Sequence, residues 1–505
     1  MNLKINKNGH QAFSSRWGFL SSVLGVAIGT GNIWRFPRIV AQNGSALGAG
    51  AFLVSWVFFL FVWSIPLIIA EYALGRKSQK GVIGTFTVIT GPKTTWMGGF
   101  VTFVSAGITF YYAVVVGWCL FYLIKMVTTP LPISTVDAFS VWNSFQSSVL
   151  PTLFHGAALI LGTAAIWKGV PSIEKLSRWI IPVLLGILFL SLFRTLTLPN
   201  SLIGIRYLFT PEWTQLLNVK IWLEALSQNA WDTGAGWGLL LTYSTYMDRQ
   251  QPLVKNAVIT GIGNNVVSLI AGIIIFGTVF SILKTDLGMT QPEVLNILRS
   301  TGPASTGLTL IWIPQLFARM ELGSIFAILF FFGLSLAGFS SLMSMLELQT
   351  RVLLDTGIGR TRSVLLVGVI SFLLGIPSAR SLTFFGNQDF VWGIALVISG
   401  TFIAYAALSY GCSKLRKEEM LIRNNDIKLG RYWDVLIKYF IPIGAIILLC
   451  WWFILSAMTY TQNESLDPFK PYSIMTCLFQ WSIAFFLLYY FNRKITKLTL
   501  GQNKD

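Results

Sequence analysis

Residues 25–37 read Gly-Val-Ala-Ile-Gly-Thr-Gly-Asn-Ile-Trp-Arg-Phe-Pro, with glycines at 25, 29 and 31 in the middle of an apolar stretch that covers 16–40. A second apolar stretch, 219–247, is interrupted in the same way by Gly234, Gly236 and Gly238. Glycine is also a common packing residue of membrane helices, so either stretch alone would be ambiguous. Because the two lie five spans apart, the pattern predicts two helices that unwind at the bilayer midplane and expose free backbone groups there.

The composition of the chain indicates a membrane protein. Of its 505 residues, 54% are hydrophobic and only 11% are charged, a balance unlike that of soluble domains. Apolar stretches of roughly 20 residues, the length that crosses a bilayer, recur about twelve times along the chain. We therefore expect an all-α polytopic membrane protein in which a single membrane domain covers 1–505.

The position of the interrupted stretches predicts how the helices are organised. Five spans in 16–196 form a first repeat, five in 219–410 form a second repeat of inverted topology, and two extra helices follow in 433–491. This arrangement places both unwound helices at the start of their repeats. Longer polar connections are expected on the outer side of the membrane, at 129–150, 199–218 and 286–320.

The net charge of +17 does not indicate a nucleic-acid partner. The lysines and arginines lie in short clusters between spans, without the interleaved aromatic residues of a nucleic-acid-binding face. With the amino terminus inside, most of them fall in cytoplasmic segments such as 414–431, as the positive-inside rule requires. We expect a multi-pass protein of the cell inner (plasma) membrane with both termini cytoplasmic, whose partners are the lipid bilayer and a small-molecule substrate. The oligomeric state is left open.

Several motifs carry a resemblance to a known family. The string Gly31-Asn-Ile-Trp-Arg-Phe-Pro37 is highly specific, and matching residues continue through essentially the whole chain, at Tyr111-Tyr112, at Thr210-Pro-Glu-Trp213 and at Ala337-Gly-Phe-Ser-Ser341. On these residues the chain resembles the neurotransmitter:sodium symporter family, and in particular its prokaryotic members. The resemblance implies a Na+-coupled secondary active symporter that carries a small amino acid or amino-acid-like solute by alternating access.

Other classes of function were weighed against this one. A Na+-coupled transporter of a creatine-, betaine- or amine-like solute stays open. A channel or a receptor-like scaffold would also fit the apolar composition, although the density of motifs argues against both. An enzyme is rejected, because His10 and His155 are the only histidines and no nucleophile lies in a recognisable arrangement with a base.

The resemblance implies one or two bound Na+ ions, held by the hard oxygens that such a cation prefers. The first sodium site would use Ala27, Asn32, Asp232 and Asn264. The second would use Gly25, Ile28, Ala337, Ser340 and Ser341. Serines in membrane helices are usually packing residues, and it is the Ala-Gly-Phe-Ser-Ser context that favours ligation.

The same matching places the solute between the two breaks, with its carboxylate near Gly29, Gly31 and the hydroxyl of Tyr112. Gly29 stands where amine-transporting relatives carry an aspartate, so it favours amino acids. The walls of the predicted solute site are Val26, Ile108, Trp231, Gly234, Trp237, Ser341 and Met345. Ordinary aromatic packing is the alternative for the two tryptophans.

The resemblance also implies an external and an internal gate. The gate residues are Arg35 and Asp389 on the outer side and Tyr246, Glu347 and Asp355 on the inner side. The family's amino-terminal arginine and tryptophan fall here on His10 and Phe13, so we expect His10 or Lys7 to pair with Asp355. A further departure is the stretch 43–52, which is expected to add a loop between the first two spans.

Asp232 is the most informative departure, because an ionisable group at the membrane midplane is expensive and is presumed functional. In chloride-dependent relatives the anion is held at four positions, which here are Trp56, Gln228, Asp232 and Ser268. We expect Asp232 to act as a resident anion, so that chloride is not required. The alternative is a protonated Asp232 that is merely hydrogen-bonded, a state that nearby sodium disfavours.

Overall fold

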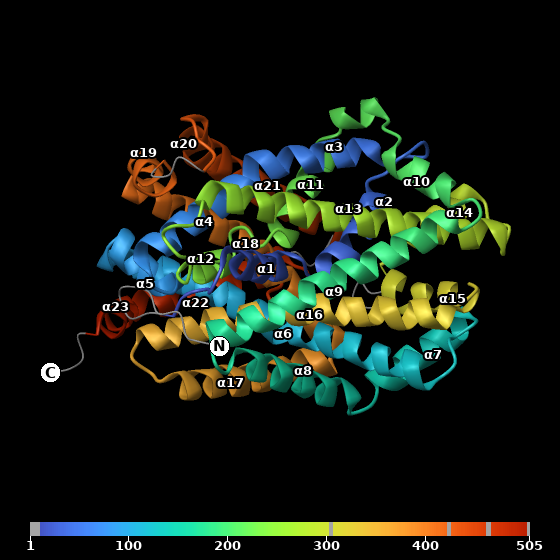
Figure 1. Ribbon diagram of the computed structural model, residues 1–505, viewed down its shortest axis with the longest axis horizontal. Coiled ribbons are helices and arrows are strands. Elements are labelled where there is room, and N and C mark those ends of the chain that lie inside the picture. The colour runs from blue at the N-terminus through green and yellow to red at the C-terminus, as the bar shows by residue number, and fades with distance from the viewer. Residues whose placement is uncertain (1–10, 302–306, 422–425, 461–465, 502–505) are drawn as a thin grey trace.

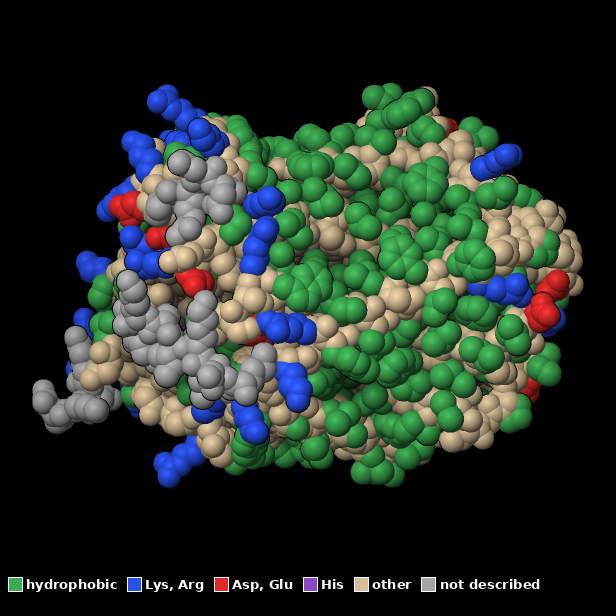
Figure 2. Space-filling model, in the orientation of Figure 1, with side chains coloured by type: hydrophobic (Ala, Val, Ile, Leu, Met, Phe, Trp, Pro, Cys, Tyr) green, Lys and Arg blue, Asp and Glu red, His purple; other side chains and the backbone are tan. Residues whose placement is uncertain are grey.

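The computed structural model describes residues 11–301, 307–421, 426–460 and 466–501. Within these ranges the chain is almost entirely helical, and its long helices run side by side along the long axis of the molecule (Figure 1). Hydrophobic side chains cover the middle of the face shown in Figure 2. Such an apolar surface is compatible with contact to lipid. Helices are compatible with lipid as well, because they satisfy their own backbone hydrogen bonds and lipid offers no partners.

Eight helical segments of the described chain are long and apolar enough to cross a membrane, or ten if each of two bent pairs is one span. The eight are Gly50–Ser78 (α3, η2 and α4), Pro92–Thr128 (η3 and α6), Val170–Thr197 (α9), Leu253–Thr285 (α13), Gly323–Asp355 (α16), Arg360–Arg380 (α17), Leu382–Tyr410 (α18) and Tyr432–Met458 (α20, η8, α21 and the start of η9). The bent pairs are Thr135–Gln146 with Leu150–Ile166 (α7 and α8, 73°) and Ile474–Tyr490 with Asn492–Leu500 (α22 and α23, 57°). Two further helices are interrupted by glycines, and their halves are too short to be counted as spans. With these two, the number of membrane spans reaches the expected total of about twelve.

Segments expected only as polar connections contain helices of their own. These are α7, α10 (Ser201–Phe209), α14 (Gln291–Arg299) and α15 (Ile313–Ala318). Ser134 with Asp137, and Thr290 with Glu293, form capping boxes at the starts of α7 and α14, which satisfies free N–H groups of the first turn. The hydrogen bonds from Thr290 also hold the pKa of the Glu293 carboxyl below its ordinary value.

Lysines and arginines gather at one end of the molecule, on the left in Figure 2. We call this the basic end. It carries α5 (Val82–Ile89), α12 (Leu239–Ser244) and α19 (Cys412–Leu415), whereas α7, α10, α14 and α15 lie at the opposite end (Figure 1).

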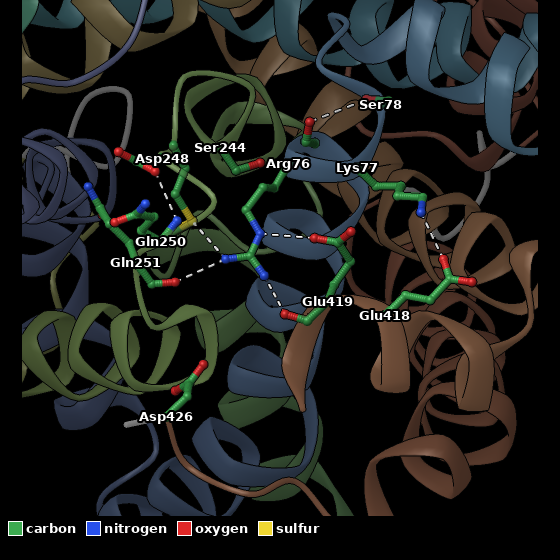
Figure 3. A network of polar contacts seen from close by, with 12 residues as sticks. Arg76, Lys77, Ser78, Ser244, Asp248, Gln250, Gln251, Glu418, Glu419 and Asp426 are labelled. Carbon is green, nitrogen blue, oxygen red and sulfur yellow. Dashed lines mark hydrogen bonds and ion pairs between the residues drawn. The ribbon is translucent and has the colours of Figure 1, made fainter. Parts of the chain in front are cut away.

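At the basic end, polar contacts fasten the segment after α18 to α4 and α13 (Figure 3). The guanidinium group of Arg76, at the end of α4, donates to the Glu419 carboxylate at 3.0 Å and to the carbonyl of Gln251 at 3.0 Å. Asp426 accepts hydrogen bonds from two N–H groups in the first turn of α13, at 3.0 and 2.8 Å. The connection between α18 and α20 is therefore bound to the bundle through buried and capping interactions.

The two predicted breaks are present. The first helix runs as α1 (Arg16–Ala27), is interrupted before Gly31, and resumes as η1 (Gly31–Arg35) and α2 (Phe36–Gln42). The second runs as α11 (Val219–Asp232) and α12, separated by 233–238. Gly234, Gly236 and Gly238 have φ of +71°, +89° and +79°, a region that residues with a Cβ rarely adopt. The backbone of the second break therefore requires its glycines.

A buried carboxylate supports the second break. Glu71 of α4 accepts hydrogen bonds from the N–H groups of Gly236 at 2.5 Å and Leu241 at 2.9 Å. Ser105 of α6 and Ser399 of α18 each donate to a carbonyl oxygen of the break at 2.6 Å. Side chains from three other helices thus satisfy the backbone groups that the break sets free, as buried polar groups require.

Candidate functional site

A cavity of about 510 Å³ lies between the two breaks and the helices α6 (Thr95–Thr128), α16 and α18. It reaches from Asn32 and Asp232 at the breaks to Gln42 and Tyr472, toward the end opposite the basic end. The residues predicted to contact a solute that line this cavity are Val26, Gly29, Gly31, Tyr112, Trp231, Gly234, Trp237, Ser341 and Met345. Ile108 is fully buried and does not line it.

Oxygen atoms converge beside the cavity, where α1 and α11 end. The N–H of Gly29 donates to Oδ1 of Asn32 at 2.8 Å, so the NH2 group of Asn32 faces Oδ1 of Asn264 at 2.7 Å. That Asn264 oxygen then lies 3.0 Å from the carbonyl oxygen of Ala27 and 3.1 Å from that of Asp232. Reversing the Asn264 amide would satisfy both carbonyls but would set two side-chain NH2 groups 2.7 Å apart.

The backbone donor decides between the two orientations. An amide orientation is assigned from its partners, and the N–H of Gly29 is fixed, so Asn32 must turn its oxygen toward it. Asn264 must then present its own oxygen to the NH2 group of Asn32. The Asn264 side-chain oxygen is then left within 3.1 Å of two carbonyl oxygens, those of Ala27 and Asp232, with no hydrogen between it and either of them. A hard cation resolves such a cluster, and the residues predicted for the first sodium site fit Na+.

A second group of oxygens joins the first break to α16. The hydroxyl of Ser340 lies 2.9 Å from the carbonyl oxygen of Ala337 and 3.5 Å from that of Ile28. The hydroxyl of Ser341 lies 3.4 Å from the carbonyl oxygen of Val26. The structure thus brings together the residues predicted for the second sodium site, namely Gly25, Ile28, Ala337, Ser340 and Ser341.

The carboxylate of Asp232 is buried beside the first oxygen cluster. Its Oδ2 accepts hydrogen bonds from Gln228 at 3.1 Å and from Ser268 at 3.4 Å, and Asn32 donates to the Ser268 hydroxyl at 2.7 Å. Oδ1 of Asp232 has no hydrogen-bond partner among the described residues. Trp56 is buried, and its indole N–H has no partner within the part of the chain that the structure describes, so of the four predicted anion-site residues it alone stands outside this network.

Tyr112 of α6 turns its hydroxyl toward the first break. That oxygen accepts hydrogen bonds from the N–H and the hydroxyl of Thr30, at 3.3 and 3.2 Å. With both acceptor positions used, the Tyr112 proton is available to donate. A Cβ on Gly29 would lie 2.8 Å from the Ser341 hydroxyl and 3.3 Å from that of Tyr112. A larger residue at this position would have to displace the Ser341 hydroxyl.

The predicted external gate residues, Arg35 and Asp389, line the cavity toward its mouth. The guanidinium of Arg35 lies over the ring of Trp231, 5.1 Å from its centre. The cavity continues past both residues to Tyr472. Glu224 also lines this region. Sequence reasoning missed Glu224, although an ionisable residue on α11, two turns before Asp232 on the same face, was a readable signal.

The predicted inner gate residue Glu347 forms an ion pair at the basic end. Glu347 of α16 is fully buried, accepts a hydrogen bond from the Tyr246 hydroxyl at 2.8 Å, and pairs with Arg360 at 2.5 Å. Asp355 pairs with Arg351 at 3.4 Å. The sequence did not predict Arg360 as the partner of Glu347, because residue spacing does not show which acidic side chain an arginine at the start of α17 contacts.

Phe13 packs against Tyr246, which donates a hydrogen bond to Glu347. It is fully buried, its N–H donates to the carbonyl of Tyr246 at 3.2 Å, and its ring lies 6.1 Å from that of Tyr243. The predicted partners of Asp355, His10 and Lys7, lie outside the described residues.

The broken helices and the central cavity define a polytopic membrane transporter. A model of the Sodium:neurotransmitter symporter family matches residues 10–149 and 140–492, and the chain belongs to this family, as the sequence predicted. It is 31% identical over 451 residues to an uncharacterized sodium-dependent transporter of Methanocaldococcus jannaschii, covering 86% of this chain and 88% of that protein. It is 29% identical to the sodium-dependent serotonin transporter of Drosophila melanogaster, covering 97% of this chain and 84% of that one.

A solved structure agrees with this assignment. The crystal structure of MhsT in complex with L-phenylalanine matches with a TM-score of 0.75 and 27% identity, over 88% of this chain and 99% of that one. The chain is therefore an integral membrane protein and a sodium-dependent transporter, not an enzyme.

Proposed function

We propose that the chain is a symporter that couples Na+ to a small amino acid or amino-acid-like solute and works by alternating access. The observation that carries the proposal is the junction of the two breaks, where two groups of oxygen atoms adjoin one cavity. Hard oxygens suit Na+, and the Tyr112 hydroxyl can donate to a carboxylate in the same cavity. The amino acid held by the MhsT structure supports the choice of solute.

We place the protein in the plasma membrane. The positive-inside rule then supports an orientation in which the basic end faces the cytoplasm. The cavity then opens to the outside, while the pair of Glu347 and Arg360 closes the inside. On this proposal the structure corresponds to the outward-facing state. Release of the solute requires the inner closure to part.

Uptake into proteoliposomes tests the proposal. With an inward Na+ gradient, labelled L-phenylalanine or L-leucine should accumulate above its external concentration, which a channel or scaffold cannot achieve. An inside-negative potential should increase uptake, since each net positive charge gains about 2.3 kcal/mol per 100 mV. A protein that fails to concentrate any amino acid, creatine or betaine under this gradient would contradict the proposal.

Removing a ligand from either oxygen group should raise the Na+ concentration needed for uptake. Asn32→Ala acts on the first group and Ser341→Ala on the second; interactions with charged groups contribute about 1.5 to 3 kcal/mol, so we expect a shift of about tenfold or more. The measurement is uptake against Na+ concentration. The control is Ser371→Ala, which changes a buried serine of a different helix, α17. Unchanged Na+ dependence in both variants would exclude these groups as sodium sites.

Tyr112→Phe should weaken solute binding by about tenfold or more, because one hydrogen bond to a charged carboxylate is lost while the ring volume is kept. Binding is measured by calorimetric titration with whichever amino acid accumulates. Tyr122→Phe is the matched control, since Tyr122 is a buried tyrosine of the same helix that does not line the cavity. An affinity of the Tyr112 variant within twofold of the parent would show that Tyr112 does not hold the solute.

Asp232 supports transport that does not require chloride. Two Na+ ions bring two positive charges into a buried place, where they need compensating negative charge. Asp232 supplies one such charge, and Gln228 and Ser268 already donate hydrogen bonds to it. A resident carboxylate would make a bound anion unnecessary.

A creatine-, betaine- or amine-like solute is the second candidate. Oδ1 of Asp232 has no hydrogen-bond partner in the described part of the chain, and this residue lines the cavity, so the carboxylate is available to a cationic group. A thermal-shift screen of both solute classes, with and without Na+, separates the candidates, because a ligand stabilises the state that binds it.

A further inference from the structure

Trp231 lies along the passage from the mouth of the cavity to its inner chamber, in contact with Arg35 and Trp237. We define the inner chamber by the lining residues nearest the breaks, Val26, Gly234, Trp237, Ser341 and Met345. The indole of Trp231 lies between this chamber and Arg35, whose guanidinium is 5.1 Å from the ring centre. The ring of Trp237 meets it edge to face at 5.4 Å.

On its remaining side, Trp231 lies against Gly393 of α18. A Cβ on Gly393 would lie 3.2 Å from Cζ2 and 3.2 Å from Nε1 of the indole, closer than an ordinary van der Waals contact. Asp389, one turn earlier on α18, shares this face. On this face, α18 therefore carries the Asp389 carboxylate and, one turn later, the backbone of Gly393, which contacts Trp231 without a side chain in between.

The helix itself gives no reason for a glycine at this position. Gly393 is inside α18 and its φ is not positive, so alanine could adopt the same backbone. Glycine inside a helix is less stable than alanine by roughly 0.5–1 kcal/mol. The bare position must therefore be explained by what lies against it.

What lies against Gly393 is a side chain and not another helix backbone. All three atoms closest to its missing Cβ belong to the indole of Trp231. Gly236 shows the other case, since the atoms closest to its missing Cβ are backbone atoms of Gly400. Close helix packing therefore accounts for Gly236 but not for Gly393.

We propose that Gly393 is a specificity-determining residue: it seats the indole of Trp231 against α18 and thereby sets the space that the inner chamber offers to the solute. The inference rests on the proposed function, since it concerns the solute of that same cavity. A Cβ at this position displaces the ring by a few tenths of an ångström. Arg35 covers the face toward the mouth, so the ring moves toward the chamber.

Gly393→Ala should therefore discriminate against large solutes. With saturating Na+, the affinity for L-phenylalanine should fall about tenfold relative to that for L-alanine, the range that pocket shape commonly provides. Trp231→Phe in the same chain should restore the ratio, because the smaller ring leaves room for the added methyl group. The ratio is measured by calorimetric titration of both amino acids.

Gly400→Ala is the matched control. Gly400 lies two turns further along α18, and a Cβ there would meet nothing closer than 3.6 Å, so the affinity ratio should stay within twofold of the parent. The same ratio in Gly393→Ala as in the parent would overturn the inference. Loss of affinity for both amino acids to the same extent would also overturn it, because that result indicates general damage.

A second readout does not depend on the solute. In protein labelled with 5-fluorotryptophan, the ¹⁹F resonance of Trp231 is identified by its loss in Trp231→Phe. Gly393→Ala should shift this resonance, whereas Gly400→Ala should leave it in place; an unmoved resonance overturns the inference. If neither amino acid binds the parent while the resonance shifts, the proposed solute class fails but the seating of Trp231 by Gly393 stands.

Discussion

Asp232→Ser is expected to make uptake depend on chloride, while the parent protein transports equally well in chloride and in gluconate. The substitution removes the carboxylate to which Gln228 and Ser268 donate hydrogen bonds and leaves these donors in place. Opposite unit charges about 5 Å apart attract by about 3 kcal/mol at an effective dielectric constant of about 20. Losing that attraction should reduce uptake in gluconate by more than tenfold, and chloride should restore much of it.

Initial rates of Na+-driven uptake in the two media give the measurement. Asp232→Asn separates charge from shape, since its amide fills the space without charge and leaves no room for an anion; it should be slow in both media. Glu224→Gln changes another acid of the same helix face and should not create chloride dependence. A parent that stops transporting in gluconate would refute the resident-anion hypothesis.

Arg360→Ala is expected to open the basic end of the protein. Glu347 is fully buried, and Arg360 contacts both of its carboxylate oxygens, at 3.2 and 2.5 Å. Removing one partner of a buried ion pair typically costs about 3–5 kcal/mol, because a charge is left uncompensated. Opening admits water to Glu347 and relieves that cost. A closed state that predominates by a hundredfold would become the minor one, since about 1.4 kcal/mol is a factor of ten.

Alkylation of a cysteine introduced by Ser344→Cys reports the opening, because Ser344 is buried one turn before Glu347 on α16. Its rate should rise at least tenfold with Arg360→Ala. Arg362→Ala removes an exposed arginine two residues away and should leave the rate unchanged. Adding Glu347→Gln should return the rate toward the parent value, since a neutral amide needs no counter-charge. Equal rates in Arg360→Ala and in its parent would show that the pair does not close this end.

Local patterns predicted the breaks and much of the site. The glycines at 234, 236 and 238 indicated a break because they interrupt an apolar stretch five spans after the one that Gly25, Gly29 and Gly31 interrupt, and their positive φ values explain why glycine is needed there. The resemblance placed Asn264 and the paired serines of α16 at the site, and the structure brings them to the first break. The serines were accessible to prediction because they belong to the continuous motif Ala337–Ser341, and Asn264 because the resemblance extends through essentially the whole chain.

Long-range partners were not predictable in the same way. Glu71 reaches the second break across 165 positions of sequence, and only its charge inside an apolar span could have drawn attention to it. The stretch 43–52 was expected to add a loop; residues 43–49 form one, whereas α3 already begins at Gly50. The sequence did not show that the Tyr207 hydroxyl would donate to the carbonyl of Ser45, or Gln291 to that of Ala46, each at 2.8 Å. Such contacts depend on how helices pack, which no spacing within one segment reveals.

The way Glu71 holds the second break has a consequence for how readily this transporter changes its substrate over evolution. Its partners are the N–H groups of Gly236 and Leu241, and every residue except proline supplies an N–H group. A mutation at a wall position such as Trp237 can therefore reshape the cavity without removing a hydrogen bond that holds the break. Selection for a new solute can act on those side chains while the same carboxylate in α4 continues to anchor the break.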